Sequence, residues 1–290
     1  MAGETILEET ISTIEAILGD DLAGATIERV VIGLFFTGVK LTSGHVGTCA
    51  TPAKSIPEAV CCPSSALAMP FPGKMRGRPA LDLVKETSSD HPIRRAVGIA
   101  ALNALAAQCH ALRPDPRVIA EIGVDAFDAA NIRDGELTVV VGAFVPFLRE
   151  LRRRGQSYLV LERDPSTLKQ EEMACYRPAS EMRNVVPQAD VLLVTGTTLI
   201  NDTLEDILVG RCASLPEGGG WTDCRPCAGR FLATWVQHSG RHACHRAGRV
   251  PGYPCRGRFR LSLLRQVGAE IRSARVKPQG RAYQRLAMSL

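Results

Sequence analysis

The chain has 290 residues, of which 45% are hydrophobic, and its mean hydropathy is close to zero. This length and composition are ordinary for a globular protein and leave room for two domains. No apolar run approaches the roughly 20 residues of a membrane-spanning helix, and the N-terminus lacks the pattern of a secretion signal. We therefore expect no membrane partner and a cytoplasmic location.

The net charge of +5 is unevenly distributed along the chain. Residues 1–210 carry 20 Lys and Arg against 27 Asp and Glu, a balance of −7. Residues 211–290 carry 15 against 3, a balance of +12. Since the basic excess lies wholly in the tail, a nucleic-acid interface would have to lie there, and we expect none in the rest of the chain.

The N-terminal part of the chain predicts an α+β domain, which we place at residues 1–115. Apolar residues three and four positions apart predict an amphipathic helix over residues 4–18. β-Branched and aromatic residues predict a strand pair or a bent hairpin over residues 27–41. The next residues, 42–52, have the composition of a loop.

A long helix is predicted near the end of this domain. Pro, Gly and Ser dominate residues 61–79, which indicates a long connection or a lid. Pro92 suits the first turn of a helix, and the Ala-rich sequence after it predicts a helix to about Leu112. A connection with one short helix near Asp125 then leads to the second domain.

The second domain, which we place at residues 116–210, predicts a parallel sheet. Three short apolar runs have the composition of buried strands. Strand and helix alternate at the spacing of a parallel α/β sheet. The strands are predicted at residues 137–141, 158–161 and 190–195, and the helices end near Arg154, Val186 and Leu208.

Polar and small residues follow each predicted strand. Ligands of an open parallel sheet bind beyond the carboxyl ends of its strands. A glycine there lets the backbone turn tightly, and hydroxyls with helix N-terminal amides suit an anion. The candidate ligand-binding residues are Gly142, Ala143 and Phe144 in the first loop, Glu162 and Asp164 in the second, and Thr195, Gly196, Thr197 and Asn201 in the third.

The spacing of Glu162 and Gly142 raises the question of a nucleotide ligand. An acidic residue about 20 positions after the first glycine commonly binds a ribose hydroxyl. The full glycine fingerprint of dinucleotide-binding proteins is absent, because Gly142 is the only glycine of its turn. A nucleotide or S-adenosylmethionine-like ligand therefore stays an alternative, and simple helix capping is the structural alternative for Thr197, Asn201 and Asp202.

Two places in the first domain supply further candidates. His45 lies in a glycine-flanked loop with Thr48 and Cys49 nearby, and His and Cys four positions apart could ligate a metal ion. Two ligands do not make a site, and a loop histidine is commonly just a surface residue. Asn103 is a polar residue on the packing face of the Ala-rich helix, where it would point towards a cleft between the domains.

Taken in order and spacing, several motifs resemble a bacterial and archaeal family of two-domain proteins. It is the DUF364 family, with a DUF4213 domain at the N-terminus, also called the heavy-metal chelation domain family. The resemblance covers about residues 5–210. It rests on Thr37-Gly-Val-Lys-Leu, the Gly44–Thr48 loop, Arg95-Ala-Val-Gly-Ile-Ala-Ala-Leu-Asn103, Val140-Val-Gly-Ala-Phe, Pro178-Ala-Ser-Glu, Ala189-Asp-Val-Leu-Leu-Val-Thr-Gly-Thr-Thr and Asn201-Asp-Thr-Leu204.

The resemblance implies a fold and a class of ligand. It implies an enolase N-terminal-like domain followed by a Rossmann-like domain, with a site in the cleft between them. The ligand would be a transition metal, a metal chelate or a small anionic molecule, and a homodimer is compatible with this prediction. No catalytic residue set is implied, and the sequence offers no nucleophile or acid–base pair that decides whether the protein is an enzyme.

The tail at residues 211–290 changes character. It holds 14 arginines, one lysine, both tryptophans and five of the ten cysteines. Its pattern Cys224-x2-Cys227 followed by His238-x3-His242, with Cys244 and His245 nearby, resembles a zinc site but has too short a spacer. Zinc or nucleic-acid binding through the tail therefore stays a third functional alternative.

We interpret the tail as the product of a reading-frame shift near residues 210–216 in a GC-rich gene. Codons allowed for residues 220–225, read one base later, can give Val-Gly-Pro-Thr-Ala, which suits a turn at a strand end of this fold. Codons allowed for residues 262–269 can give Arg-Tyr-Tyr-Gly-Lys-Ser-Ala with the same one-base offset. No apolar run follows the helix that ends near Leu208. We therefore predict an incomplete parallel sheet and a poorly packed tail.

Overall fold

The computed structural model describes residues 5–56, 68–114, 118–121, 127 and 130–212, and the backbone of three strands in the tail. The chain forms two compact units. The first is built on residues up to Pro114, and the second on Asp115 to Trp235 with Cys244 to Ser262. No helix of the described residues is long and apolar enough to cross a membrane.

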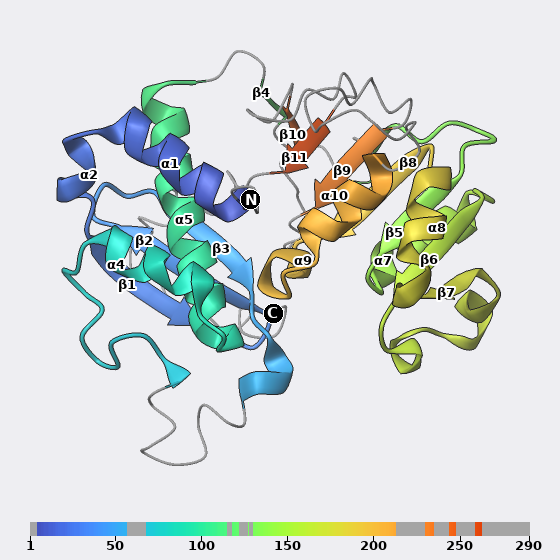
Figure 1. Cartoon of the computed structure of the whole chain (residues 1–290), viewed down its shortest axis with the longest axis horizontal. Helices are drawn as coiled ribbons and strands as arrows, with labels where there is room; N and C mark the ends of the chain where they lie inside the picture. Colours follow the sequence, from blue (N-terminus) through green and yellow to red (C-terminus); the bar gives the residue numbers. More distant parts are fainter. Residues whose placement is uncertain are drawn as a thin grey trace, which may run out of the picture. The chain divides into compact units, whose positions relative to one another are not determined.

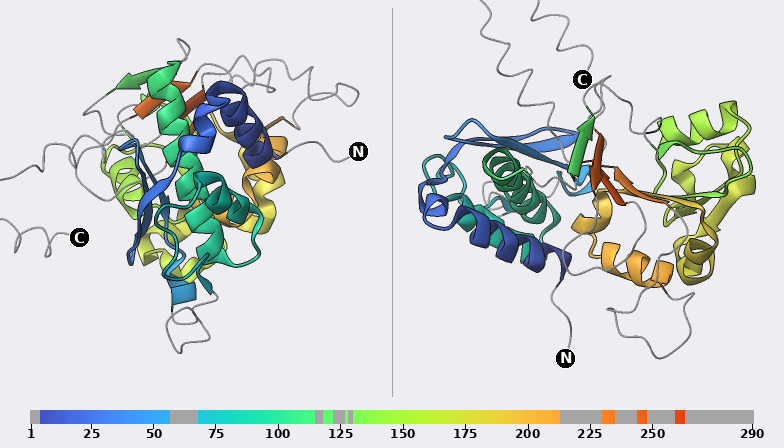
Figure 2. Two further views of the ribbon diagram at one scale, coloured as in Figure 1. Left: turned by 90° about the vertical axis from the view of Figure 1, so that its left-hand side faces the viewer. Right: turned by 90° about the horizontal axis from the view of Figure 1, so that it is seen from above.

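The first unit combines a three-stranded antiparallel sheet with helices. The order β1-β2-β3 makes β2 the central strand, and α5 packs on β2 and β3 (Figure 1). Figure 2 shows α5 between this sheet and α1. The structure confirms the first helix, the hairpin over residues 27–41 and the long Ala-rich helix. The elements are α1 (Ile6–Leu18), α2 (Asp21–Gly24), β1 (Ile27–Ile32), β2 (Phe36–Leu41), β3 (Val46–Ala50), η1 (Ala53–Ser55), α4 (Ala80–Val84), η3 (Lys85–Ser88) and α5 (Pro92–Leu112).

Strand β3 corrects the prediction that residues 42–52 form a loop. Its small residues pack close to α5 rather than marking a turn. A Cβ on Gly47 would collide with the carbonyl of Ala100 and the amide of Ala104. Asn103 donates a hydrogen bond from Nδ2 to the carbonyl of Thr48 at 2.8 Å, which ties the strand to the helix.

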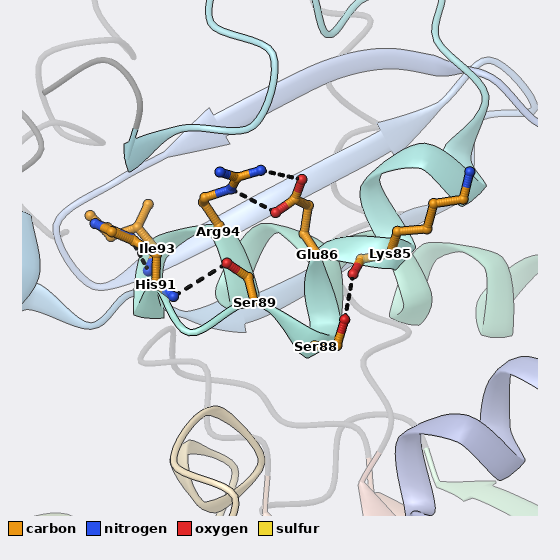
Figure 3. Close-up of polar contacts among 7 residues, drawn as sticks. All are labelled: Lys85, Glu86, Ser88, Ser89, His91, Ile93 and Arg94. Atoms are coloured by element: carbon orange, nitrogen blue, oxygen red, sulfur yellow. Dashed lines mark hydrogen bonds and ion pairs between the residues drawn. The ribbon is translucent and has the colours of Figure 1, made fainter. Parts of the chain in front are cut away.

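The N-terminal end of α5 is held by polar contacts with the segment before it (Figure 3). Arg94 donates from Nε and Nη2 to the two carboxylate oxygens of Glu86, both at 2.7 Å. His91 accepts the amide hydrogen of Ile93 and donates its own to Ser89. Further along, a Cβ on Gly98 would lie 2.5 Å from the Thr87 nitrogen. The helix therefore packs backbone to backbone on η3, and an ion pair fixes the register.

The second unit is an α/β structure with parallel strands. The parallel sheet predicted from the three apolar runs is confirmed. Its core lies under α7, where Phe147, Leu148 and Leu151 pack on Val140 and Val160. The described elements are β4 (Val118–Glu121), β5 (Thr138–Val141), α7 (Val145–Arg153), β6 (Tyr158–Glu162), η4 (Pro165–Thr167), η5 (Gln170–Cys175), β7 (Tyr176–Pro178), η6 (Ala179–Glu181), α8 (Met182–Val185), η7 (Val186–Gln188), β8 (Val191–Thr195), α9 (Thr197–Ile200) and α10 (Leu204–Cys212).

The prediction that the sheet is incomplete after Leu208 is wrong. Strand β9 (Arg230–Thr234) pairs with β8 in parallel over five residue pairs. Strands β11 (Phe259–Ser262) and β10 (Cys244–Ala247) extend the sheet to β4, giving the order β4-β10-β11-β9-β8-β5-β6-β7. The sequence analysis did not predict these three strands, because each has only four or five residues and contains arginine or histidine among its apolar residues.

Candidate ligand site at the carboxyl edge of the parallel sheet

The order of the strands in the parallel sheet indicates where the candidate site lies. From β5, the chain adds β6 and β7 on one side and then β8 and β9 on the other. The loops after β5 and β8 consequently leave neighbouring strands in opposite directions. In open parallel sheets such a reversal leaves a crevice at the carboxyl ends of the strands, where ligands bind.

The loops after β5 and β8 meet closely at this reversal. Gly142 has a φ of +96°, a conformation that L side chains rarely adopt. A Cβ at this position would lie 2.6 Å from Cγ2 of Thr195. The glycine is therefore required twice, by its backbone conformation and by the close approach of the threonine.

Glu162, at the end of β6, holds the first loop in place. Its Oε2 accepts the amide hydrogen of Ala143 at 2.6 Å, and its Oε1 accepts those of Arg163 at 2.7 Å and Asp164 at 3.1 Å. A carboxylate has about four acceptor positions, of which three are used here. The structure thus gives Glu162 a positioning role, while its predicted contact with a ribose hydroxyl stays a prediction.

The structure also places two other predicted residues in structural roles. Asp164 caps the short η4 helix, accepting from the amide of Ser166 at 3.1 Å and from its hydroxyl at 2.6 Å. The ring of Phe144 packs edge-on against Phe147, with centroids 4.2 Å apart. Both side chains contribute to loop geometry, and their predicted contact with a ligand stays a prediction.

Hydroxyl groups gather in the loop after β8. Thr197 Oγ1 donates to Thr195 Oγ1 at 3.3 Å, and Thr198 Oγ1 donates to the carbonyl of Thr195 at 2.8 Å. Thr195 and Thr197 are half-buried, whereas Asn201 is exposed. Because the amide of Ala143 is bonded to Glu162 and that of Phe144 to the carbonyl of Gly142, this loop offers a ligand more polar groups than the first.

The predicted metal ligand lies in the turn between β2 and β3. Nδ1 of His45 lies 3.0 Å from Oγ of Ser43, which donates its own proton to Oε1 of Gln108 at 2.8 Å. No sequence pattern indicates this series of hydrogen bonds, because Gln108 lies 65 positions from Ser43.

Metal-ligating side chains do not converge in the part of the chain that the structure describes. Within those residues, no group of three or more His, Cys, Asp or Glu could hold a metal ion. Burial raises the pKa of the Cys49 thiol above its ordinary range, which favours the neutral form. His45 as a metal ligand stays a prediction. The zinc candidates Cys224, Cys227, His238 and His242 lie outside the described residues, and Cys244 and His245 are described only as backbone.

Comparison with known protein families shows which family this chain belongs to. Residues 15–106 match the DUF4213 family and residues 125–213 match the DUF364 family, both described as "Putative heavy-metal chelation". Together the matches cover more than half of the chain. The chain is a DUF364-family protein. This confirms the resemblance in the sequence motifs, and the DUF364 match ends at residue 213, where the composition changes.

Relatives of this DUF364-family protein share its fold more clearly than its sequence. An uncharacterized protein of Methanocaldococcus jannaschii is 29% identical over 117 residues, 40% of this chain and 41% of that protein. The match thus spans about two fifths of the relative's length. A DUF364-family protein of unknown function from Pyrococcus horikoshii is 18% identical, with a TM-score of 0.53 over 79% of this chain and 78% of that chain. Another from Desulfitobacterium hafniense is 15% identical, with a TM-score of 0.53 over 79% of each chain.

Proposed function

We propose that the second unit binds a small anionic ligand, in the first instance a metal chelate, at the carboxyl edge of its parallel sheet. The contact of Gly142 with Thr195 at the strand-order reversal carries this proposal. Around it the chain offers hydroxyl and amide groups, from Thr195, Thr197 and Asn201. Such groups can form hydrogen bonds to the oxygens of a small anion or of the molecule that chelates a metal. A bare heavy-metal ion instead needs several His, Cys or carboxylate ligands.

The finer description of the fold belongs to the same proposal. Numbered along the chain from β5, the order β7-β6-β5-β8-β9 is 3-2-1-4-5, which supports a Rossmann-like domain. An antiparallel sheet covered by α5 supports an enolase N-terminal-like domain. We extend the ligand class to this chain from the description of its family.

Thermal unfolding with a graded set of probes tests the proposal. We expect Ni²⁺–citrate or citrate to raise the melting temperature in a concentration-dependent way, and Ni²⁺ alone to raise it less. Thr195→Val, which removes the hydroxyl but keeps the shape, should abolish the shift. Thr26→Val is the matched control, because Thr26 is a half-buried threonine far from this sheet edge in sequence. A shift that survives Thr195→Val and Thr197→Val would contradict the site.

A nucleotide or S-adenosylmethionine is the second candidate ligand, favoured by the strand order and by Glu162 at the end of β6. A ribose hydroxyl would take the fourth acceptor position of this carboxylate. In the same assay, stabilisation by AMP or S-adenosylmethionine that is lost in Glu162→Gln supports this candidate. Stabilisation of the wild-type chain by citrate, with none by AMP or S-adenosylmethionine, excludes it.

A further inference from the structure

Strand β1 forms an open edge of the antiparallel sheet in the first unit. Among the described strands it pairs with β2 alone (Figure 1). On its other side, Ile27 at the start of the strand donates its amide hydrogen to the carbonyl of Arg78 at 2.9 Å and accepts that of Gly77 at 2.8 Å. Within the residues that the structure describes, nothing continues this pairing along the rest of β1. Such an edge pairs readily with another strand.

The hydrogen bonds of the hairpin determine which backbone groups face the open edge. Gly33 donates its amide hydrogen to the carbonyl of Phe36 at 2.9 Å. Residues of an antiparallel pair alternate between hydrogen-bonded and non-hydrogen-bonded positions. In the register of β1 and β2, Val31 is therefore bonded to its opposite residue, whereas Val30 and Ile32 are not. The N–H and C=O groups of Val30 and Ile32 consequently point away from β2, towards the open edge.

Exposed apolar side chains gather at the same place. The structure describes five exposed large hydrophobic residues, and three of them belong to this hairpin. Val31 in the strand is 56% exposed, and Leu34 and Phe35 in the turn are 61% and 58% exposed. Residues 30–37 carry no charge. Outward backbone groups together with uncharged apolar side chains favour a partner strand of the same chemistry over a charged partner.

We infer that β1 pairs with β1 of a second copy of the chain, antiparallel and about a two-fold axis at Val31. This register places Val30 of each copy opposite Ile32 of the other, so that the outward N–H and C=O groups of all four residues bond across the axis. The two Val31 residues face each other as a non-hydrogen-bonded pair, in which side chains are closest, and cover each other. The two antiparallel sheets then join into one continuous sheet.

The charges at the start of β1 are compatible with this register. Arg29 lies opposite Gly33 of the other copy, which has no side chain to oppose it. Arg29 is exposed and shares a face with Val31, so its aliphatic stem reaches Val31 of the other copy, its diagonal neighbour. A register centred on Arg29 would instead place two like charges face to face. The bulge between Ile27 and Arg29 ends the regular edge and limits the pairing to residues 29–33.

Sedimentation velocity of the full chain over a concentration series tests the inference. The strand pair is short, and stable interfaces bury about 800 Å² on each partner, so we expect a monomer–dimer transition between roughly 1 and 100 μM. Val31→Lys should stay monomeric throughout, because two like charges would meet at the axis. Its melting temperature should stay close to that of the monomeric wild type, because Val31 is exposed.

Leu112→Lys is the matched control for added charge. Leu112 is 55% exposed at the end of α5 and lies outside the open edge. This variant should dimerise as the wild type does. If it is as monomeric as Val31→Lys, added charge at any site controls association, and the assignment to β1 is overturned.

Mixing two variants tests the register itself. Val31→Lys and Val31→Glu should each be monomeric alone, whereas an equimolar mixture should dimerise, because opposite charges then meet across the axis. A mixture that stays monomeric overturns the pairing about Val31.

Two further outcomes overturn the inference. One is a wild-type chain that stays monomeric up to about 100 μM, including one that sediments with phosphatidylcholine vesicles, because the apolar turn would then contact a lipid surface. The other is a dimer that Val31→Lys leaves intact, because the two copies would then meet elsewhere. None of these results depends on the residues of the proposed ligand site in the second unit.

Discussion

At the scale of single residues, Gly142 is constrained both by its backbone conformation and by its packing against Thr195. We expect Gly142→Ala to lower the free energy of unfolding by about 2 kcal/mol or more, through a left-handed alanine and a collision with Thr195. In a Thr195→Ser background, which lacks the Cγ2 atom, the same change should cost only the conformational part, about 1 kcal/mol. Urea denaturation of the wild type, the two single variants and the double variant measures the cost of Gly142→Ala in both backgrounds. Equal costs in the two backgrounds would show that the threonine methyl does not limit the turn.

Tyr158 is the residue whose titration reports most directly on the core of the second unit. It is 8% exposed, and burial, with the adjacent Cys175 thiol, raises the pKa of Tyr158 to about 12. A tyrosine phenol in the unfolded chain has a pKa of about 10. The folded pKa is the higher one, so this contribution to stability is complete below about pH 10 and is lost as the pH rises to about 12.

The phenolate absorbance of the four tyrosines measures this shift. We expect a last deprotonation phase near the shifted pKa of Tyr158, absent in Tyr158→Phe and present in the control Tyr176→Phe. The Tyr158→Phe variant should also lose less stability than the wild type across the alkaline range. A last phase that persists in Tyr158→Phe belongs to another tyrosine and refutes the assignment.

At the scale of elements, the contact between α5 and η3 depends on the absence of a side chain at Gly98. Alanine is normally favoured over glycine inside a helix by roughly 0.5–1 kcal/mol. Here its Cβ would lie 2.5 Å from the Thr87 nitrogen and 2.7 Å from the Glu86 carbonyl carbon. We therefore expect Gly98→Ala to destabilise the chain by about 1–3 kcal/mol in chemical denaturation.

Gly24→Ala is the control for this prediction, because nothing lies within 4 Å of a Cβ at Gly24 and its φ is not positive. It should be neutral or stabilising by up to about 1 kcal/mol. If both variants are stabilised, α5 and η3 can separate without cost and the close packing is not a requirement of the fold.

At the scale of the whole molecule, the tail decides whether β8 is an inner strand or an edge. Truncation after Cys212 removes β9 and would leave β8 unpaired along that side. We expect this truncated chain to aggregate, because an exposed apolar strand edge recruits other chains. A chain truncated after Ser262 keeps β9, β10 and β11 and is the control. Light scattering compares them.

Equal solubility of the two truncated chains would support the opposite view, that the tail contributes nothing to the sheet. The reading-frame shift stays a prediction, which sequencing of the gene checks directly. A one-base correction near residues 210–216 should then continue the DUF364 match beyond residue 213.

Local sequence determined most of the elements of this protein. The spacing of apolar residues predicted α1 and the strands β5, β6 and β8, because helix and strand periodicity are local properties. Proline at position 92 and the alanines after it predicted α5. The loops at Gly142, Glu162 and Thr195 were predicted as site candidates because ligands bind at the carboxyl ends of parallel strands.

Only the tertiary structure decided what these residues do. Gly142 has its role through Thr195, 53 positions later, and Thr48 through Asn103, 55 positions later. The segment that reads as a loop becomes β3 because α5 accepts its small residues, and the short strands of the tail exist through pairing with β8 and β4. Contacts between distant residues leave no periodic signal along the chain. The sequence therefore predicted which residues are site candidates, but only the folded structure shows which residues they contact.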